Sequence, residues 1–272
     1  MGQSGRDEGA RSLAIVYADL DRPPLRAAAL RAALVRDGGL WRDLRVFAST
    51  RSTNADVAAE AKAGAPEGLV ILAEQQTGGR GRLDRSWSSP PGAGLTFSVL
   101  LRPSRPAPSW GWLPLLAGVA VTAALREHAG VQAGLKWPND VLVGGRKCAG
   151  ILAEVAGEAV VLGVGLNVTT TDAELPDERA TSLALAAATT TDRDTVLRVV
   201  LRALAAAYAG WQADPDSLAP AYRSVCTTLG RQVRLHLPDG GIVEGIAGDV
   251  DAEGRLVVDG KPYAAADVVH LR

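Results

Sequence analysis

The sequence predicts an α/β (α+β) protein in which a mixed sheet carries helices and a small all-β unit follows. Three observations support this class. Apolar runs of strand length alternate with helical patterns through the first 225 residues, two-residue turn signals join some of these runs, and only short strands and turns remain after residue 226. With 272 residues, 47% of them hydrophobic, the chain can bury the cores of one large and one small domain.

Apolar periodicity predicts three helices in the large domain, over residues 25–35, 54–63 and 195–211. Ser52 or Thr53 is a suitable N-cap for the second helix, and Gly64 is a suitable end for it. The longest apolar run, residues 110–125, is too short to span a bilayer comfortably. We expect it to form a helix that is buried against the sheet.

Strands are predicted where short apolar or alternating runs are bounded by turn residues. They cover residues 69–73, 95–102, 141–143, 146–155 and 159–168. Gly144 and Gly145, between two of these runs, are typical of a two-residue hairpin turn. Hairpins mixed with helices favour a largely antiparallel or mixed sheet.

The C-terminal region has a different character. From residue 229 the chain consists of short strand-like runs separated by turn dipeptides such as Asp239-Gly240 and Asp259-Gly260. About forty residues of this kind predict a small β-barrel that packs on the larger domain. We therefore expect a polar, disordered tail over residues 1–20, a main domain over 21–225 and a barrel over 226–272.

Composition argues against several classes of function. The net charge of −1, from 29 basic and 30 acidic residues, gives no global support to nucleic-acid or membrane binding, so any anion site must be local. Cys148 and Cys226 have neither metal-binding nor redox spacing and fit a reducing compartment. The polar N-terminus lacks the apolar region of a signal peptide. We therefore expect a cytoplasmic protein.

A glycine- and arginine-rich segment, GGRGRLDRSW, spans residues 78–87. Its glycines let the backbone approach a ligand closely, and Arg80, Arg82 and Arg85 carry planar charged groups that suit carboxylate or phosphate oxygens. The segment is neither a P-loop nor a dinucleotide fingerprint, because GxxxxGK[ST] and GxGxxG are both missing from it. Taken alone, it would equally suit an exposed basic turn.

A group of neutral polar residues lies upstream, comprising Ser52, Thr53, Asn54 and Gln76. Each of these side chains can both donate and accept hydrogen bonds. Together they suit a neutral ligand with N–H and C=O groups, such as a cyclic urea, a sugar or a nucleobase. Helix capping by itself would also account for the first three.

Three later motifs add polar side chains to strand ends. In KWPND, Lys136 is a point charge suited to phosphate or carboxylate, and Asn139 belongs to a turn. In RKCAGIL, Lys147 is a second cation for a polyphosphate. In GVGLNV, Asn167 follows small residues that leave space for a ligand. Ordinary strand exits and hairpin turns would account for each motif taken alone.

In this order and spacing, STN, QTGGRGRLDRSW, KWPND, RKCAGIL and GVGLNV resemble the biotin–protein ligases, also called biotin–[acetyl-CoA carboxylase] ligases. The resemblance covers residues 44–271. It implies an α/β catalytic domain followed by an SH3-like domain, and an ATP-dependent, AMP-forming reaction in two steps. The biotin carboxylate attacks the α-phosphate of MgATP, giving biotinyl-5′-AMP and pyrophosphate. A lysine amine of a biotin carboxyl carrier protein then attacks this anhydride, giving an amide and AMP.

The same resemblance implies roles for individual residues. Biotin would be bound by Ser52, Thr53, Asn54, Gln76, Arg80, Gly81, Arg82 and Lys136. ATP and the adenylate would be bound by Arg82, Arg85, Trp87, Asn139, Lys147 and Asn167. Arg82 and Lys136 would be catalytic, because they would stabilise the charge that develops on the carboxylate and α-phosphate. Mg²⁺ would be held by the ATP phosphates, with Asn167 as a candidate protein ligand.

The sequence departs from the family pattern in two places. The loop reads GRGRLDR where the family usually has GRGRxGR, so Asp84 replaces a flexible glycine and adds a negative charge near the phosphates. Some family members also carry an N-terminal helix-turn-helix domain and repress biotin genes. Because residues 1–44 are too few for such a domain beside the tail and one helix, we expect no binding to nucleic acid.

Three alternatives stay open at this point. A lipoate–protein ligase would share the fold and the acyl-adenylate chemistry, but lipoate has no ureido ring for the polar cluster to bind. A nucleic-acid-binding module would use the arginine-rich loop and the barrel, against the near-zero net charge. A non-catalytic biotin sensor would have no need of Lys136 and Arg82 to activate a carboxylate.

Overall fold

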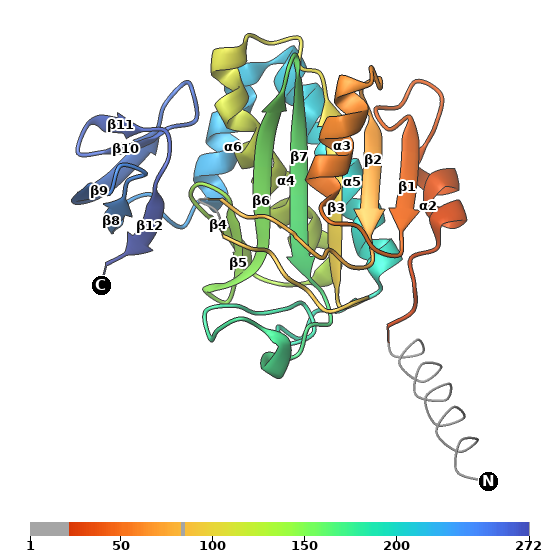
Figure 1. Cartoon of the computed structure of the whole chain (residues 1–272). Coiled ribbons are helices and arrows are strands. Elements are labelled where there is room, and N and C mark those ends of the chain that lie inside the picture. Colours follow the sequence, from red (N-terminus) through yellow and green to blue (C-terminus); the bar gives the residue numbers. More distant parts are fainter. Residues whose placement is uncertain (1–21, 83–84, 272) are drawn as a thin grey trace, which may run out of the picture.

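The structure, a computed structural model, describes residues 22–82 and 85–271. Seven strands form the main sheet: β1 (Asp43–Phe47), β2 (Leu69–Ala73), β3 (Gly94–Leu101), β4 (Ala133–Lys136), β5 (Asp140–Val143), β6 (Arg146–Ala156) and β7 (Ala159–Asn167). Their order is β1-β2-β3-β7-β6-β5-β4 (Figure 1). β1 and β2 run parallel and the other neighbours antiparallel, which confirms the predicted mixed sheet.

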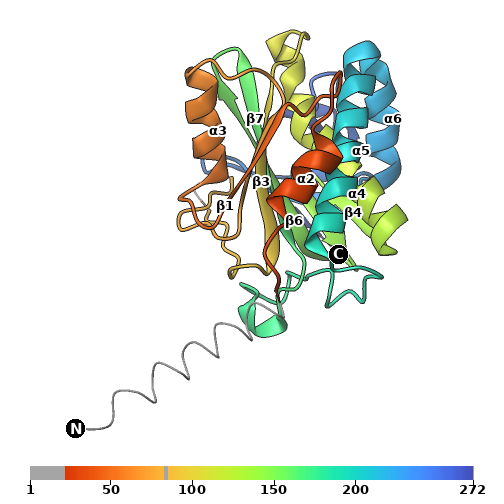
Figure 2. The same ribbon diagram turned by 90° about the vertical axis from the view of Figure 1, so that its right-hand side faces the viewer.

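Helices cover both faces of this sheet (Figure 2). They are α2 (Ala27–Leu34), α3 (Thr53–Lys62), α4 (Trp112–Ala129), α5 (Arg193–Ala213) and α6 (Leu218–Val225), with short 3-10 turns η1 (Ala107–Gly111), η2 (Asp172–Glu174) and η3 (Pro215–Ser217). Helices α2, α4 and α5 pack on one face of the sheet, and α3 packs on the other. The three helices predicted from periodicity are confirmed, whereas β1 and α6 were not predicted.

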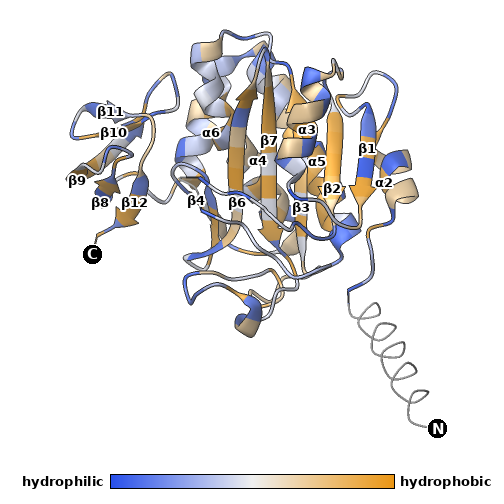
Figure 3. Ribbon diagram, in the orientation of Figure 1, coloured by the Kyte–Doolittle hydropathy of each residue, from blue (hydrophilic) through white to orange (hydrophobic). Residues whose placement is uncertain are grey.

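Helix α4 occupies the centre of the core, as predicted for the long apolar run. Its buried side chains include Leu113, Leu116 and Leu125, and the helix contacts β4, β5, β6 and α5. Figure 3 shows apolar residues concentrated along the strands that this layer covers. Among the described residues, the stretch 107–129 is the one helix long and apolar enough to cross a membrane, but most of it is buried inside the protein. The burial of this helix in the core therefore accounts for its high content of apolar residues.

Strand β7 shows how the sheet makes room for a site. Successive residues of a strand face opposite sides, so every second side chain of β7 points toward α3. Ala159 and Val161 are two of these, and they pack beneath Val57 of the helix. The next two are Gly163 and Gly165. The space that side chains would take at these positions is occupied by Asn54 and Trp87, which the sheet thereby admits to the base of the site.

The C-terminal unit is a five-stranded antiparallel sheet. Its strands are β8 (Gln232–His236), β9 (Ile242–Val250), β10 (Leu256–Val258), β11 (Lys261–Tyr263) and β12 (Asp267–His270), in the order β11-β10-β9-β8-β12. At the two predicted turns, Gly240 and Gly260 have positive φ angles of 86° and 78°, a conformation that glycine adopts without strain. The sheet agrees with the small, SH3-like β-unit that was expected.

Two tryptophans of the main domain attach this unit. The indole of Trp112 donates to the carbonyl of Ala252 at 2.8 Å, and that of Trp137 donates to the carbonyl of Gly254 at 3.2 Å. Helix α6 ends at Val225 and β8 begins at Gln232, so the expected boundary at residue 226 falls in the connection between them. The tail expected over residues 1–20 lies outside the described residues.

Candidate functional site

A pocket lies on the α3 face of the sheet, above the glycines of β6 and β7. Nearly all of the predicted site residues line it: Ser52, Thr53, Asn54, Gln76, Arg80, Gly81, Arg82, Arg85, Trp87, Lys136, Asn139 and Lys147. Thr96, Asp140, Leu152 and Asp267 also line it and were not predicted. The fold thus gathers residues of all five motifs of the main domain into one place and adds β12 of the C-terminal sheet.

The polar group at one end of the pocket is built on the start of α3. Ser52 is the N-cap of the helix, and its Oγ accepts a hydrogen bond from the backbone N–H of Ala55 at 3.4 Å. Thr53 donates to Gln76 Oε1 from both its backbone N–H, at 2.8 Å, and its hydroxyl, at 3.1 Å. Capping and ligand binding are therefore compatible here, because the same helix end presents buried polar groups to the pocket.

Ser98 of β3 supports this group and was missed in the sequence. Its Oγ lies 2.7 Å from Thr53 Oγ1 and 2.6 Å from Asn54 Oδ1, and the residue is fully buried. A signal was present in the strand sequence GLTFSVLL, where Thr96 and Ser98 alternate with apolar residues. Two polar residues on one face of an otherwise apolar buried strand indicate a polar surface beneath that face.

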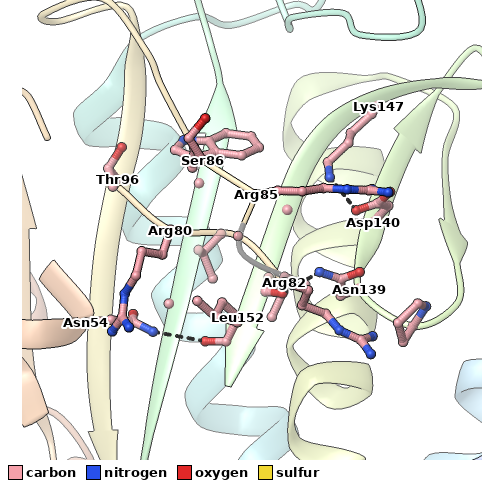
Figure 4. A pocket seen from close by; sticks show the side chains of 18 of the residues that line it. Asn54, Arg80, Arg82, Arg85, Ser86, Thr96, Asn139, Asp140, Lys147 and Leu152 are labelled. Carbon is pink, nitrogen blue, oxygen red and sulfur yellow. Dashed lines mark hydrogen bonds and ion pairs between the residues drawn. The ribbon is translucent and has the colours of Figure 1, made fainter. Parts of the chain in front are cut away.

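Glu154 of β6 was also missed. Its Oε2 accepts from Asn54 Nδ2 at 2.6 Å, and its Oε1 lies 2.9 Å from Arg80 Nη2. The available signal was a single carboxylate in the apolar strand RKCAGILAEVA. In Figure 4 the Arg80 side chain extends from the loop toward Asn54. Because Glu154 contacts both side chains, the loop and the polar group meet at its carboxylate.

The segment between β2 and β3 folds over the pocket as a loop. Glycines shape its entry, because a Cβ at Gly79 would collide with the backbone of Trp87 and the amide of Gln76. Arg80 and Ser86 form an isolated bridge across the loop. No regular strand or helix forms in the part of the segment that the structure describes. Leu83 and Asp84, including the glycine replacement noted in the sequence, lie outside the described residues.

Two further cations around the pocket are paired with carboxylates. Lys147 Nζ lies 2.6 Å from Asp140 Oδ1, and both are labelled in Figure 4. Arg85 Nη2 lies 2.5 Å from Asp267 Oδ2 of the C-terminal sheet. Each pair keeps a positive side chain close to the pocket while balancing its charge.

Arg82 and Lys136 differ from these cations. Among residues 22–82 and 85–271, neither has a carboxylate oxygen within 4.0 Å. Burial lowers the pKa of the Arg82 guanidinium and of the Lys136 ammonium, while the more distant charges of Asp140 and Asp267 act in the opposite direction. Two partly desolvated cations without a direct partner suit an anionic ligand, whose charge would offset the cost of their burial.

Trp87 forms part of the pocket wall against the sheet. A Cβ at Gly165 would overlap its indole, and a Cβ at Gly150 would lie 3.2 Å from its Cζ3. Lys147 Nζ lies 5.9 Å from the centre of the ring, within the range of a cation–π contact. The indole Nε1 is buried without a hydrogen-bond partner among the described residues, so this donor is available to a ligand.

The two predicted asparagines have different positions. Asn139 lines the pocket, and its Nδ2 donates to the carbonyl of Ile151 at 2.8 Å, which fastens the KWPND turn to β6. Asn167 is buried and does not line this pocket; its Nδ2 donates to the carbonyl of Thr181 at 3.0 Å. The nucleotide and Mg²⁺ roles expected for Asn167 stay predictions.

Two family models match the chain. Residues 46–169 match the biotin/lipoate A/B protein ligase family, and residues 228–271 match the biotin protein ligase C terminal domain. These two segments contain the pocket motifs up to β7 and the C-terminal sheet, respectively.

Individual proteins show the same similarity. The biotin–[acetyl-CoA-carboxylase] ligase of Mycobacterium tuberculosis is 46% identical over 260 residues, which cover 92% of this chain and 97% of that protein. The bifunctional ligase/repressor BirA of Bacillus subtilis is 36% identical over 225 residues, which cover 79% of this chain and 67% of that protein. Among solved structures, the biotin protein ligase from Aquifex aeolicus in complex with biotin and ATP has a TM-score of 0.73 and 28% identity, with coverage of 85% of this chain and 100% of that chain.

Proposed function

The chain belongs to the biotin/lipoate A/B protein ligase family and is a biotin–protein ligase, and we propose that its reaction takes place in the pocket on the α3 face of the sheet. Biotin and ATP are its substrates. The observation that carries the site assignment is the meeting of two partly buried cations, Arg82 and Lys136, with a buried neutral polar group in one pocket; neither cation has a carboxylate partner among the residues that the structure describes.

The ureido ring of biotin would lie against the start of α3. The ring has two N–H donors and one carbonyl acceptor, and Thr53, Asn54 and Gln76 offer side chains of both kinds. These side chains are held by Ser98 and by one another, so little conformational freedom is lost when a ligand binds. Lipoate has no polar ring atoms for these groups to meet.

The carboxylate of biotin and the α-phosphate of ATP would meet between Arg82 and Lys136. Both reacting groups are anions, so their approach is opposed by charge repulsion. Cations placed where this charge accumulates lower the barrier without forming a bond to the substrate. The carboxylate itself is the nucleophile and pyrophosphate is the leaving group, so the enzyme needs no nucleophilic side chain.

The nucleotide would occupy the part of the pocket near Trp87 and Lys147. The indole offers an apolar surface and an N–H that has no partner within residues 22–82 and 85–271. Lys147 and Arg85 can exchange their carboxylate partners for phosphate oxygens. Mg²⁺ fits this site through the ATP phosphates, since the ion commonly keeps waters and takes one or two carboxylates, and Asp140 lines the pocket. When bound, the ion would reduce the negative charge of the triphosphate.

Transfer to the acceptor is the second half of the proposal. A lysine amine of a biotin carboxyl carrier protein would attack the anhydride, and the glycine-rich loop would keep water from it in the meantime. A cytoplasmic setting is consistent with the chemistry of the cysteines. Cys148 and Cys226 are both free, and burial raises the pKa of the Cys148 thiol to about 12, which keeps that thiol unreactive at neutral pH.

The decisive experiment is incubation of the protein with MgATP, biotin and a biotin carboxyl carrier domain, followed by mass spectrometry of the carrier. We expect one biotinyl group on a single lysine and none on a carrier in which that lysine is arginine. A parallel reaction with lipoate tests the alternative ligase. Modification of a carrier by lipoate only would overturn the assignment of biotin.

A further inference from the structure

A carboxylate that the reaction does not require joins the two ends of the proposed site. Glu154 on β6 accepts a hydrogen bond from Asn54 through Oε2, at 2.6 Å, and forms an ion pair with Arg80 through Oε1, at 2.9 Å. We propose that Glu154 is a positioning residue for the ligase reaction, one that sets the orientation of the Asn54 amide and anchors the glycine-rich loop through Arg80. This inference rests on the proposed function of the pocket.

The first part of this role concerns the direction of the Asn54 amide. An ionised carboxylate can only accept hydrogen bonds, so Glu154 requires the NH₂ end of the amide to face it. The Oδ1 end then lies 2.6 Å from the Ser98 hydroxyl, which can donate to it. Gly163 lies directly beneath, where a Cβ would overlap Asn54 Oδ1. The nitrogen of the amide also donates to the carbonyl of Leu152, at 3.4 Å, but the contact with Glu154 is much shorter and is the one that a side-chain substitution can remove.

The second part concerns the loop. Arg80 is flanked by Gly79 and Gly81, and its side chain is 56% exposed, so local packing does little to hold it. The contact with Glu154 ties its guanidinium to the sheet. In Figure 4 the arginine extends from the loop toward the polar group beside Asn54. An ion pair between partly exposed side chains contributes only about 0–1 kcal/mol, but it gives the loop a fixed contact with the sheet.

Because one carboxylate serves both partners, the two effects are coupled. A ligand that fixes Asn54 also fixes Glu154, and a fixed Glu154 is a better anchor for Arg80. The reverse holds equally, since the coupling between two binding events is reciprocal. Glu154 thereby connects occupation of the ureido end of the pocket with closure of the loop over its other end.

Stability alone does not require a carboxylate here. The strand neighbours of Glu154 are Ala153 and Val155, and the β6–β7 pairing is made by the backbone. The ion pair with Arg80 is partly exposed, with side chains 56% and 33% accessible, so it contributes only about 0–1 kcal/mol to stability. A role limited to folding would therefore predict little change in ligand binding when the carboxylate is removed.

The test compares Glu154→Ala and Glu154→Gln with Glu158→Ala, which removes an exposed carboxylate four residues later on the β6–β7 turn. Biotin affinity is measured by calorimetry without ATP, and loop anchoring by the rate of tryptic cleavage after Arg82 or Arg85. We expect Glu154→Ala to weaken biotin binding ~10-fold and to speed loop cleavage several-fold. Glu154→Gln, with one accepting oxygen instead of two, should be intermediate, and Glu158→Ala should match the wild type.

A double variant tests whether Glu154 restrains the loop through Arg80 or by a general effect on the flexibility of the protein. In an Arg80→Ala background, Glu154→Ala should still weaken biotin binding but should accelerate loop cleavage no further. Wild-type biotin affinity and cleavage rate in Glu154→Ala would overturn the proposal, as would equal effects in Glu158→Ala. Circular dichroism establishes that each variant is folded, and Glu154→Gln serves if the alanine variant is not. A wild-type protein that fails to biotinylate a carrier would overturn the proposed function instead.

Discussion

The guanidinium of Arg85 and the carboxylate of Asp267 meet at 2.5 Å, and this ion pair joins the glycine-rich loop to β12 of the C-terminal sheet. Burial of Asp267 acts to raise its pKa, but the hydrogen bond and charge of Arg85 outweigh this and hold that pKa below its usual range. The carboxylate is therefore ionised at neutral pH. Since both side chains are partly exposed, the pair contributes only about 0–1 kcal/mol to stability, and its main effect is to restrain the loop.

Asp267→Asn should release this end of the loop. We expect faster tryptic cleavage after Arg82 or Arg85 in the absence of ligands, with a melting temperature within about 4 °C of the wild type. The difference between the two proteins should shrink at high salt, because salt screens exposed ion pairs. Equal cleavage rates at low salt would show that Arg85 is not restrained by Asp267 in solution.

Arg82→Ala and Lys136→Ala should each slow adenylate formation about 100-fold or more, because each removes a cation from the place where the carboxylate and the α-phosphate would meet. Both variants should fold normally, since neither side chain is part of the apolar core. Biotin-dependent exchange of pyrophosphate into ATP measures the step. Arg202→Ala, which removes an exposed arginine on α5, is the control. Near-normal exchange in both pocket variants would discredit the site.

Gly165→Ala should disturb the nucleotide end of the pocket, because the added methyl group would overlap the indole of Trp87. We expect the KM for ATP to rise about tenfold, with a smaller change for biotin and an altered tryptophan fluorescence spectrum. Gly210→Ala on α5 is a matched control, since no atom lies within 4 Å of its added Cβ. Unchanged ATP kinetics in Gly165→Ala would separate Trp87 from nucleotide binding.

Glu74→Ala should destabilise the main domain. The Glu74 carboxylate lies 2.6 Å from Arg193 Nη1, where the two side chains are 16% and 5% exposed, and it also accepts from the backbone of Leu25. Removing Glu74 leaves the buried positive charge of Arg193 without this carboxylate, which costs about 3 kcal/mol of stability. That corresponds to a fall in melting temperature of about 6–12 °C for a protein of this size.

A surface pair provides the comparison for this experiment. Glu60→Ala removes one partner of Arg45, where both side chains are more than a third exposed, and should cost about 1 kcal/mol or less. Thermal unfolding followed by circular dichroism measures both variants. Similar losses of stability in Glu74→Ala and Glu60→Ala would contradict the view that burial makes the loss of a charge partner more costly.

His270 should make the protein less stable in mild acid. Burial, assisted by the positive charges of Lys136 and Arg231, lowers the pKa of its imidazole to about 4, and Nε2 lies 3.0 Å from Thr228 Oγ1. The unfolded chain takes up this proton near its ordinary pKa of about 6.5, so stability is full above that pH and falls as the pH drops toward 4. The loss at pH 5 should be about 1 kcal/mol after allowance for partial solvent exposure.

Removing the imidazole tests the predicted direction of the pH dependence of stability. In His270→Gln, the free energy of unfolding should change less between pH 7 and pH 5 than it does in the wild type, because glutamine takes up no proton. Urea denaturation at the two pH values measures the difference. An identical pH dependence in the two proteins would show that another group is responsible.

The sequence by itself determined the elements and the chemical types present. Residues 69–73 form β2 as predicted, because a short apolar run between turn signals has few alternatives, and Gly144-Gly145 forms the predicted hairpin turn with φ angles of 57° and 78°. The order and spacing of the polar motifs were also enough to indicate a ligase of this family. These features depend on local geometry and on composition, which a linear pattern records.

Only the tertiary structure decided which side chains meet. Glu154 is separated from Asn54 by 100 residues and Arg85 from Asp267 by 182, so no local spacing could reveal either contact. Antiparallel pairing of β6, β7 and β3 places Glu154, Gly163 and Ser98 on one face, and packing of the C-terminal sheet brings Asp267 to the loop. Asn167 is buried and its amide donates to the carbonyl of Thr181, so it does not line the pocket as the amides of Asn54, Gln76 and Asn139 do. Partners of this kind are selected by sheet register and domain packing, which are properties of the whole chain.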